Sequence, residues 1–147
     1  MGTGSVQGLR ILLANTYTLY LKTQNFHWNV TGSNFIMLHE FFEGQYRDLG
    51  EAIDKIAERI RSLNAPAPGS FEEFIALKTL EEAKAGVNVM SIAMINDLIK
   101  DHKDIHRSIM LLLEQAKTEK DEVTQDLLIE RLTFHEKTMW MLRAHTA

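Results

Sequence analysis

Residues 34–63, with the sequence NFIMLHEFFEGQYRDLGEAIDKIAERIRSL, determine the fold of this 147-residue chain. No proline interrupts the stretch, and its apolar side chains recur mostly at intervals of three or four positions. This spacing is typical of a helix that buries one face in a core. The apolar residues are Phe35, Leu38, Phe42, Leu49, Ile53, Ile56, Ile60 and Leu63. The sequence therefore predicts one long amphipathic helix.

The same helix is predicted to carry a polar face beside its apolar face. If each residue advances by about 100° from His39, the apolar residues lie between about −40° and −120°. Three acidic residues lie between about 40° and 100°: Glu43, Asp54 and Glu58. Gly50 and Ala57 share this side, at about 20° and 0°, and small residues allow another backbone to approach closely. We therefore expect the polar face to pack against a helix of a second chain.

Two imidazoles and two carboxylates, from His27, His39, Asp54 and Glu58, form a mixed ligand set that suits a divalent metal. His39 and Asp54 are 15 residues apart, which is about 22 Å along a helix. One copy of the helix cannot bring both to one ion, so two chains must meet if these residues share a metal. An antiparallel pair that crosses near residues 46 and 47 would give two equivalent sites per symmetric dimer.

Each of these four residues, taken singly, has a simpler interpretation. A lone histidine in a helix is more often a structural hydrogen-bonding group than a ligand, and exposed carboxylates are commonly solvated. The joint pattern favours a metal, because His27 closes one helical segment, His39 opens the next, and both carboxylates share the face that avoids the core.

Four long helices and one short helix are predicted, with no alternating strand pattern and no internal repeat. Gly32, followed by Ser33 or Asn34, suits the boundary between the first two. The prolines in residues 64–69 end the second helix, and Asp121 suits the cap of the last. Ser70 with Glu73 is a capping-box signature for the short helix. The long helices cover about residues 6–29, 34–63, 89–118 and 122–144, and the short one ends near residue 77.

The predicted connections are unequal in length. Some 25 residues separate the second and third long helices, whereas the other connections are a few residues long. One long crossover in a four-helix bundle is the arrangement of ferritin-like folds. We therefore predict an all-α, ferritin-like four-helix bundle with a short extra helix in the crossover, formed by residues 1–147 as a single domain.

The composition excludes several functional classes. Without cysteine, the chain has no disulfide, thiolate zinc site or cysteine nucleophile, and this fits a reducing compartment. No secretory signal or membrane-length apolar run is present, so we expect an unexported, cytoplasmic protein. A net charge of −4 argues against a broadly basic surface. Arg10 is the only cation in the first ten residues, so a lysine-rich arm is absent there.

The runs HWNVTGSNFIMLHEFF at 27–42 and DKIAERI at 54–60 resemble the Dps family, the small ferritins that protect DNA during starvation. The ending is also similar, with DLL at 126–128, HEK at 135–137 and WMLR at 140–143. The resemblance covers nearly the whole chain. It implies a hollow dodecamer that oxidises Fe(II), preferentially with hydrogen peroxide, and stores the ferric product.

In this resemblance the ferroxidase centre lies across a two-fold interface and holds iron, with two ions expected per site. His27 and His39 come from one subunit, and Asp54 and Glu58 come from its neighbour. Glu58 is the best candidate to bridge two irons, and Glu43 either binds a weaker second iron or nucleates mineral, or it belongs to a solvated face. Trp28 is either an electron donor near the irons or an interface anchor.

The start of the last helix has two interpretations. The resemblance places it at a three-fold pore, where Asp121, Asp126 and Glu130 would attract cations. Acidic residues at a helix N-terminus are also stabilising by themselves, because the backbone amides there carry partial positive charge. Both interpretations remain open on the sequence alone.

Other readings are weaker. We do not extend the resemblance to DNA binding, because the basic tail of the DNA-binding members is missing. Two alternatives to the iron-storing ferroxidase remain: a DNA-compacting cage, and a cage whose site holds zinc. No histidine has a glutamate three positions before it, so the Glu-x-x-His pattern of ordinary ferritins is absent. His102 and His106, with Asp101 beside them, could bind zinc, but surface or interface histidines are the favoured interpretation.

Overall fold

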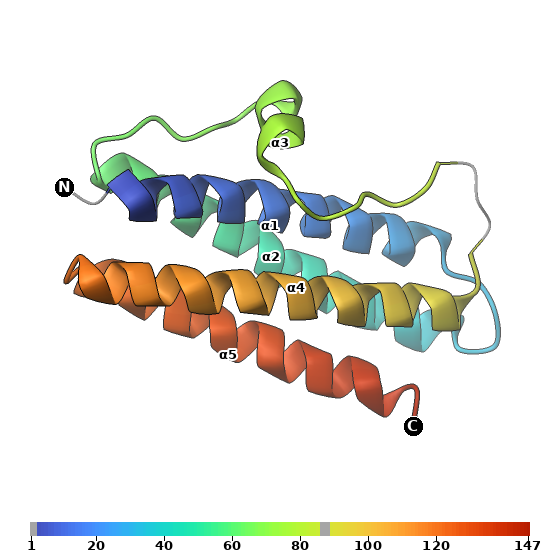
Figure 1. The fold of residues 1–147 in the computed structure, drawn as a ribbon. Coiled ribbons are helices and arrows are strands. Elements are labelled where there is room, and N and C mark those ends of the chain that lie inside the picture. The colour runs from blue at the N-terminus through green and yellow to red at the C-terminus, as the bar shows by residue number, and fades with distance from the viewer. Residues whose placement is uncertain (1–2, 86–88) are drawn as a thin grey trace.

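The computed structural model describes residues 3–85 and 89–147, in which all regular structure is helical and no strand occurs (Figure 1). The long crossover between the second and third long helices is confirmed, as is the short helix within it. Residues 1 and 2, which belong to the stretch without a basic arm, lie outside the described residues. The five helices are α1 (Thr3–Asn29), α2 (Phe35–Ser62), α3 (Phe71–Leu77), α4 (Ser91–Thr118) and α5 (Glu122–Ala144).

The helix ends follow local chemistry. Gly32 adopts φ +115° between α1 and α2, a conformation that favours glycine. Asn34 takes the N-cap position of α2, but its side chain makes no cap hydrogen bond. At α3 the predicted capping interaction forms, because the backbone N–H of Glu73 donates to Ser70 Oγ at 3.2 Å. Asp121 caps α5 by accepting from the backbone N–H of Thr124 at 3.0 Å.

The four long helices form two antiparallel hairpins, α1 with α2 and α4 with α5, which pack against each other (Figure 1). The crossover returns over α1, with α3 against that helix. Lys22 fixes this segment, because its ammonium donates to the carbonyl of Glu81 and pairs with Asp101 at 2.8 Å and Asp97 at 3.1 Å. In the described residues, no helix is long and apolar enough to cross a membrane.

The core consists of two apolar clusters with polar residues between them. One cluster includes Leu13 of α1 and Ile105 of α4, and the other includes Leu19 of α1 and Leu98 of α4. On the same helices the buried polar residues Thr16 and His102 fall between the two clusters, and His135 does so on α5. Polar groups therefore interrupt the middle of the bundle.

The prediction that His102 is a surface or interface residue is wrong. Its side chain is fully buried and its Nδ1 lies 2.8 Å from Nδ1 of His135, which is also buried. A partner 33 residues away satisfies one ring nitrogen of each histidine, which lowers the cost of burying both. His106, one turn later, is partly exposed and bonds Glu136 at 2.9 Å through Nε2.

Candidate metal centre

His27 and His39 face each other across the junction of α1 and α2. The end of α1 and the start of α2 run antiparallel, and this brings the two rings into a stack with centroids 3.7 Å apart and planes at 13°. The Nδ1 atom of His27 lies 2.6 Å from the carbonyl oxygen of His39, and Nδ1 of His39 lies 2.6 Å from the carbonyl oxygen of His27. Each histidine thus bonds the backbone of the other.

This reciprocal bonding determines which nitrogen of each ring is free. A carbonyl oxygen only accepts hydrogen bonds, so Nδ1 must carry the proton in both rings. In the neutral ring, which carries a single proton, Nε2 keeps its lone pair, as in metal-binding histidines whose other nitrogen donates to a backbone carbonyl. The two free nitrogens could therefore serve as metal ligands.

Glu43 joins the two histidines from one turn further along α2. One ligand atom from each of His27, His39 and Glu43 lies within 4.8 Å of the other two, and Glu43 Oε1 is 3.9 Å from His27 Nε2. The Arg47 Nε–H donates to Glu43 Oε2 at 3.0 Å, and this hydrogen bond is the main cause of a lowered pKa for the Glu43 carboxyl. Its negative charge faces the histidine pair.

Asp54 and Glu58 are not brought to the histidines within one chain. Both are exposed residues of the unbroken helix α2, so the separation of about 22 Å between His39 and Asp54 holds. Asp54 lines an open groove of about 560 Å³ together with Tyr20 and Tyr46. The predicted four-residue site is therefore split into two half-sites, and the histidine half is the one in which donors converge.

Within its own chain, Gly50 lies against an aromatic ring, and the approach of a second chain at this residue stays a prediction. A Cβ added there would lie 3.2 Å from Cε1 of Tyr20, in the same chain. The glycine thus accommodates an aromatic ring of α1. Trp28 is 59% exposed, which suits an interface anchor that another chain would cover.

Two aromatic residues beside the histidines were missed by the sequence analysis. The Phe35 ring stacks on His39 with centroids 5.1 Å apart, and the Tyr46 ring meets the His27 ring edge-on at 5.2 Å. Tyr46 lies seven residues after His39, two helical turns along nearly the same face. This spacing could have predicted that Tyr46 lies on the same side of the helix as His39.

The acidic residues at the start of α5 have unequal environments. Asp121 caps the helix and accepts from Arg59 Nη2 at 2.9 Å, and Glu130 pairs with Lys55 at 2.9 Å. Asp126 is exposed. Asp121 is thus already engaged within its own chain, and the pore assignment of the three residues stays a prediction.

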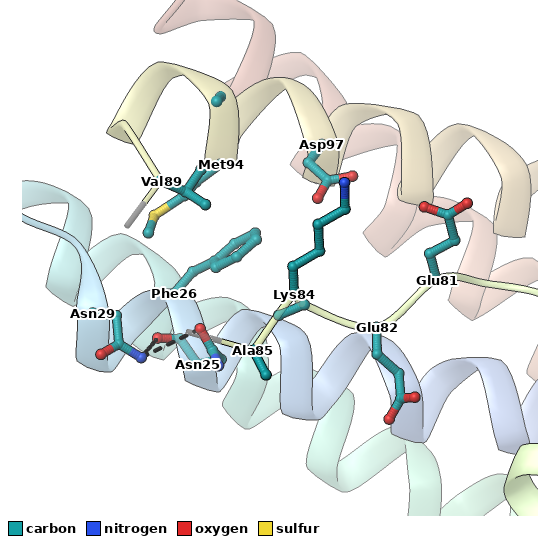
Figure 2. A pocket seen from close by; sticks show the side chains of 12 residues that line it. Asn25, Phe26, Asn29, Glu81, Glu82, Lys84, Ala85, Val89, Met94 and Asp97 are labelled. Atoms are coloured by element: carbon teal, nitrogen blue, oxygen red, sulfur yellow. Dashed lines mark hydrogen bonds between the residues drawn. The ribbon is translucent and has the colours of Figure 1, made fainter. Parts of the chain in front are cut away.

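A separate cavity of about 580 Å³ lies between the end of α1, the crossover and the start of α4 (Figure 2). It contains none of the predicted site residues. Figure 2 shows Glu81 and Glu82 pointing in opposite directions, so these neighbouring carboxylates do not form a ligand pair. Among the described residues, the histidine half-site is the one group of three or more potential ligands close enough for one ion.

Comparison with known proteins gives consistent matches. The family model of the ferritin-like domain matches residues 6–147. The DNA protection during starvation protein 2 of Bacillus anthracis is 34% identical over 139 residues, which cover 95% of this chain and 94% of that protein. An uncharacterized low temperature-induced protein of Nostoc is 38% identical over 133 residues, covering 90% and 74%.

Solved structures agree with these relatives. A Dps protein from Vibrio cholerae, described as a member of a superfamily of ferritin-like diiron-carboxylate proteins, superposes with a TM-score of 0.94 at 30% identity and covers 99% of this chain and 91% of its own. A Dps protein from Bacillus brevis superposes with a TM-score of 0.91 at 32% identity, covering all of both chains.

Proposed function

Because the chain belongs to the ferritin-like family, in its DNA protection during starvation (Dps) branch, we propose that it binds Fe(II) between subunits and oxidises it. Hydrogen peroxide is the preferred oxidant, and the ferric product is stored in a hollow dodecamer. Iron is the substrate of this reaction. Each Fe(II) supplies one electron, so two of them reduce one peroxide to water without releasing a hydroxyl radical.

The reciprocal hydrogen bonds between His27 and His39 are the observation that supports this proposal most directly. They leave two unprotonated nitrogens beside the Glu43 carboxylate, a borderline donor set that suits iron, though zinc, manganese and cobalt would also bind. Glu43 then acts as an additional, weaker ligand.

The site is completed by a second copy of the chain. Asp54 and Glu58 are exposed on the same helix as His39, and an antiparallel α2 of a neighbour would carry its own carboxylates to these histidines. Glu58 would bridge two irons through its two oxygens. The exposed Trp28 would be covered by the same neighbour, next to a ligand.

The acidic start of α5 has a proposed role in iron uptake. Asp126 is exposed, and Glu130 is held by Lys55, so Asp126 would contribute most of the attraction for Fe(II) where three chains converge. A DNA-compacting cage is the second candidate function. The net charge of −4 and the single cation in residues 1–10 weigh against it.

Complementation tests the shared site. Subunits with His39→Ala are mixed with subunits with Asp54→Ala after dissociation and reassembly, and each preparation receives anaerobic Fe(II) followed by peroxide. A mixed symmetric dimer has one site with both lesions and one with neither. We expect ferric absorbance to recover partly in the mixture and in neither parent.

Proof of mixing, by native mass spectrometry of a mass-labelled parent, is the control for this experiment. If mixed cages form and remain as inactive as the parents, the ligands do not come from different chains and the proposal fails.

A further inference from the structure

All three tyrosines of the chain lie in one row that begins at the metal centre. Tyr46 meets the His27 ring edge-on with centroids 5.2 Å apart. Tyr20 meets Tyr46 at 5.8 Å, and Tyr17 meets Tyr20 at 5.7 Å, again edge-to-face in both cases. The sequence contains no other tyrosine.

The row runs along α2 from one half-site to the other. Its first ring touches the histidine half-site. Tyr20 packs against Gly50 and lines the same groove as Asp54, and Tyr17 borders a cavity with Ala57, one residue before Glu58. The row of tyrosines thus extends from the histidines to the part of the chain that carries Asp54 and Glu58.

Packing alone does not account for three phenols at these positions. Each is partly exposed, and none of the hydrogen bonds between described residues uses a tyrosine hydroxyl. Phenylalanine would provide the same edge-to-face contacts. Tyrosine adds a hydroxyl that water can reach at these partly exposed positions, and its phenol can also lose an electron and a proton together.

We propose that Tyr46, Tyr20 and Tyr17 form an electron relay between two metal centres of one dimer. The inference rests on the proposed function, in which the histidines of one chain belong to one centre and the carboxylates of the same chain belong to the other. The relay serves the case in which a centre holds a single Fe(II) when peroxide arrives. Tyr46 contacts His27 rather than a metal, so it is an electron-relay residue and not a ligand.

The electrons and atoms balance as follows. One Fe(II) and the Tyr46 phenol each give one electron to peroxide, so that Fe(II), H₂O₂, the phenol and one proton yield Fe(III), a tyrosyl radical and two waters. The radical then passes to Tyr20 by exchange of an electron and a proton. It ends when an Fe(II) in the other centre returns one electron and a proton restores the phenol. In sum, two Fe(II), one peroxide and two protons give two Fe(III) and two waters.

Rapid freeze-quench EPR of the assembled protein tests the relay. The protein is given about half an Fe(II) per centre, then excess peroxide, and is compared with protein given two Fe(II) per centre. We expect a transient tyrosyl signal at low iron, narrowed by deuterated tyrosine, and a several-fold smaller signal at full loading. Tyr46→Phe, which preserves the ring contact, should lose most of the signal and increase spin-trapped hydroxyl radical.

Two further variants separate the steps. In Tyr20→Phe the radical should form on Tyr46 and persist several-fold longer, because its onward transfer is blocked. Trp140→Phe is the matched aromatic control, since Trp140 is exposed on α5 and outside the row, and it should leave the tyrosyl signal at its parental intensity.

The outcomes are distinguishable. Fe(II) oxidation without a tyrosyl signal, or a signal that survives Tyr46→Phe, would overturn the relay while leaving the ferroxidase proposal intact. An unchanged radical lifetime in Tyr20→Phe would overturn the transfer between centres. If peroxide oxidises no Fe(II) in the parent protein, the proposed function fails and the relay fails with it.

Discussion

Two pairs of histidines lie close together in this molecule, and they differ in what their ring nitrogens face. In the pair His27 and His39, each Nδ1 bonds the backbone carbonyl of the other residue. In the pair His102 and His135, the two Nδ1 atoms bond each other at 2.8 Å, and both Nε2 atoms are buried without a partner among the described residues. The first pair thus directs two lone pairs to a common point, whereas the second uses one lone pair internally.

The charges around the two pairs differ as well. The Glu43 carboxylate lies beside the first pair. The buried guanidinium of Arg131 lies near the second pair. The pKa values of His102 and His135 are lowered chiefly by burial and further by the charge of Arg131. Burial lowers the pKa of His102 to about 3. A cation would be disfavoured beside Arg131. The two pairs therefore differ in hydrogen bonding and in nearby charge, and we expect a metal to bind at the first pair and not at the second.

The largest effect should come from removing a ligand of the first pair. His39→Ala should weaken Fe(II) or Zn(II) binding by at least about 100-fold, because even outer-shell partners of metal ligands cost 10- to 100-fold when lost. His102→Gln is the matched change in the second pair, and its metal affinity should equal that of the parent. Anaerobic titration calorimetry on folded, assembled protein measures both. Equal losses in the two variants would contradict the contrast.

The second pair should instead govern stability in acid. The pKa values of His102 and His135 are lowered in the folded state, chiefly by burial. Below about pH 6.5 the unfolded chain therefore binds protons at these two residues that the folded chain does not bind. The stabilisation is complete above pH 6.5 and is lost as the pH falls. Between pH 7.5 and 5.5 the two residues together should remove roughly 3 kcal/mol from the free energy of unfolding.

One buried acid acts in the opposite direction. Burial raises the pKa of Asp101 to about 6, although Lys22 opposes the rise. Because the folded state then binds the proton more tightly, Asp101 should return about 1 kcal/mol over the same interval, leaving a net loss of about 2 kcal/mol from the three residues. Urea unfolding at fixed protein concentration measures this dependence.

A double variant isolates the histidine contribution. His102→Leu with His135→Leu should abolish most of the loss between pH 7.5 and 5.5, whereas His145→Gln, at the end of α5, should retain it. If the double variant shows the same pH dependence as the parent, the buried pair is not its source.

The helices could be predicted from the sequence because their signals are local. Apolar spacing and the caps Ser70 and Asp121 placed most ends within a few residues. The start of α1 was missed by three residues, because residues 3–5 carry no apolar side chain. In the structure Gly4 and Gly8 allow α1 to approach α4, where a Cβ on Gly8 would lie 2.4 Å from Leu112. Glycine is suited to these helical positions because another helix packs closely there, and that contact cannot be predicted from the local sequence.

The candidate site was predictable in composition but not in arrangement. His27, His39 and Glu43, which the structure brings together, were predicted from their types and spacing, and the need for a second chain stays a prediction. The ring stack and the reciprocal hydrogen bonds depend on how closely two helices approach, which no local pattern encodes. His102 was misjudged for the same reason, because its partner His135 lies on another helix.

The smallest effect is expected from a substitution that removes the carboxylate beside the first pair, so that this pair resembles the second. Glu43→Gln removes the carboxylate charge while preserving size and the stacked histidines. We expect metal affinity to fall by roughly 10-fold, the lower end of the range for groups that support metal ligands, because both histidines and the carboxylates of the second chain would remain. Glu40→Gln, an exposed residue three positions earlier, is the matched control and should bind metal like the parent. Titration of both variants with Zn(II) measures the difference without turnover. If Glu43→Gln and Glu40→Gln bind metal equally well, Glu43 belongs to the solvated face, and the tautomers alone distinguish the two histidine pairs.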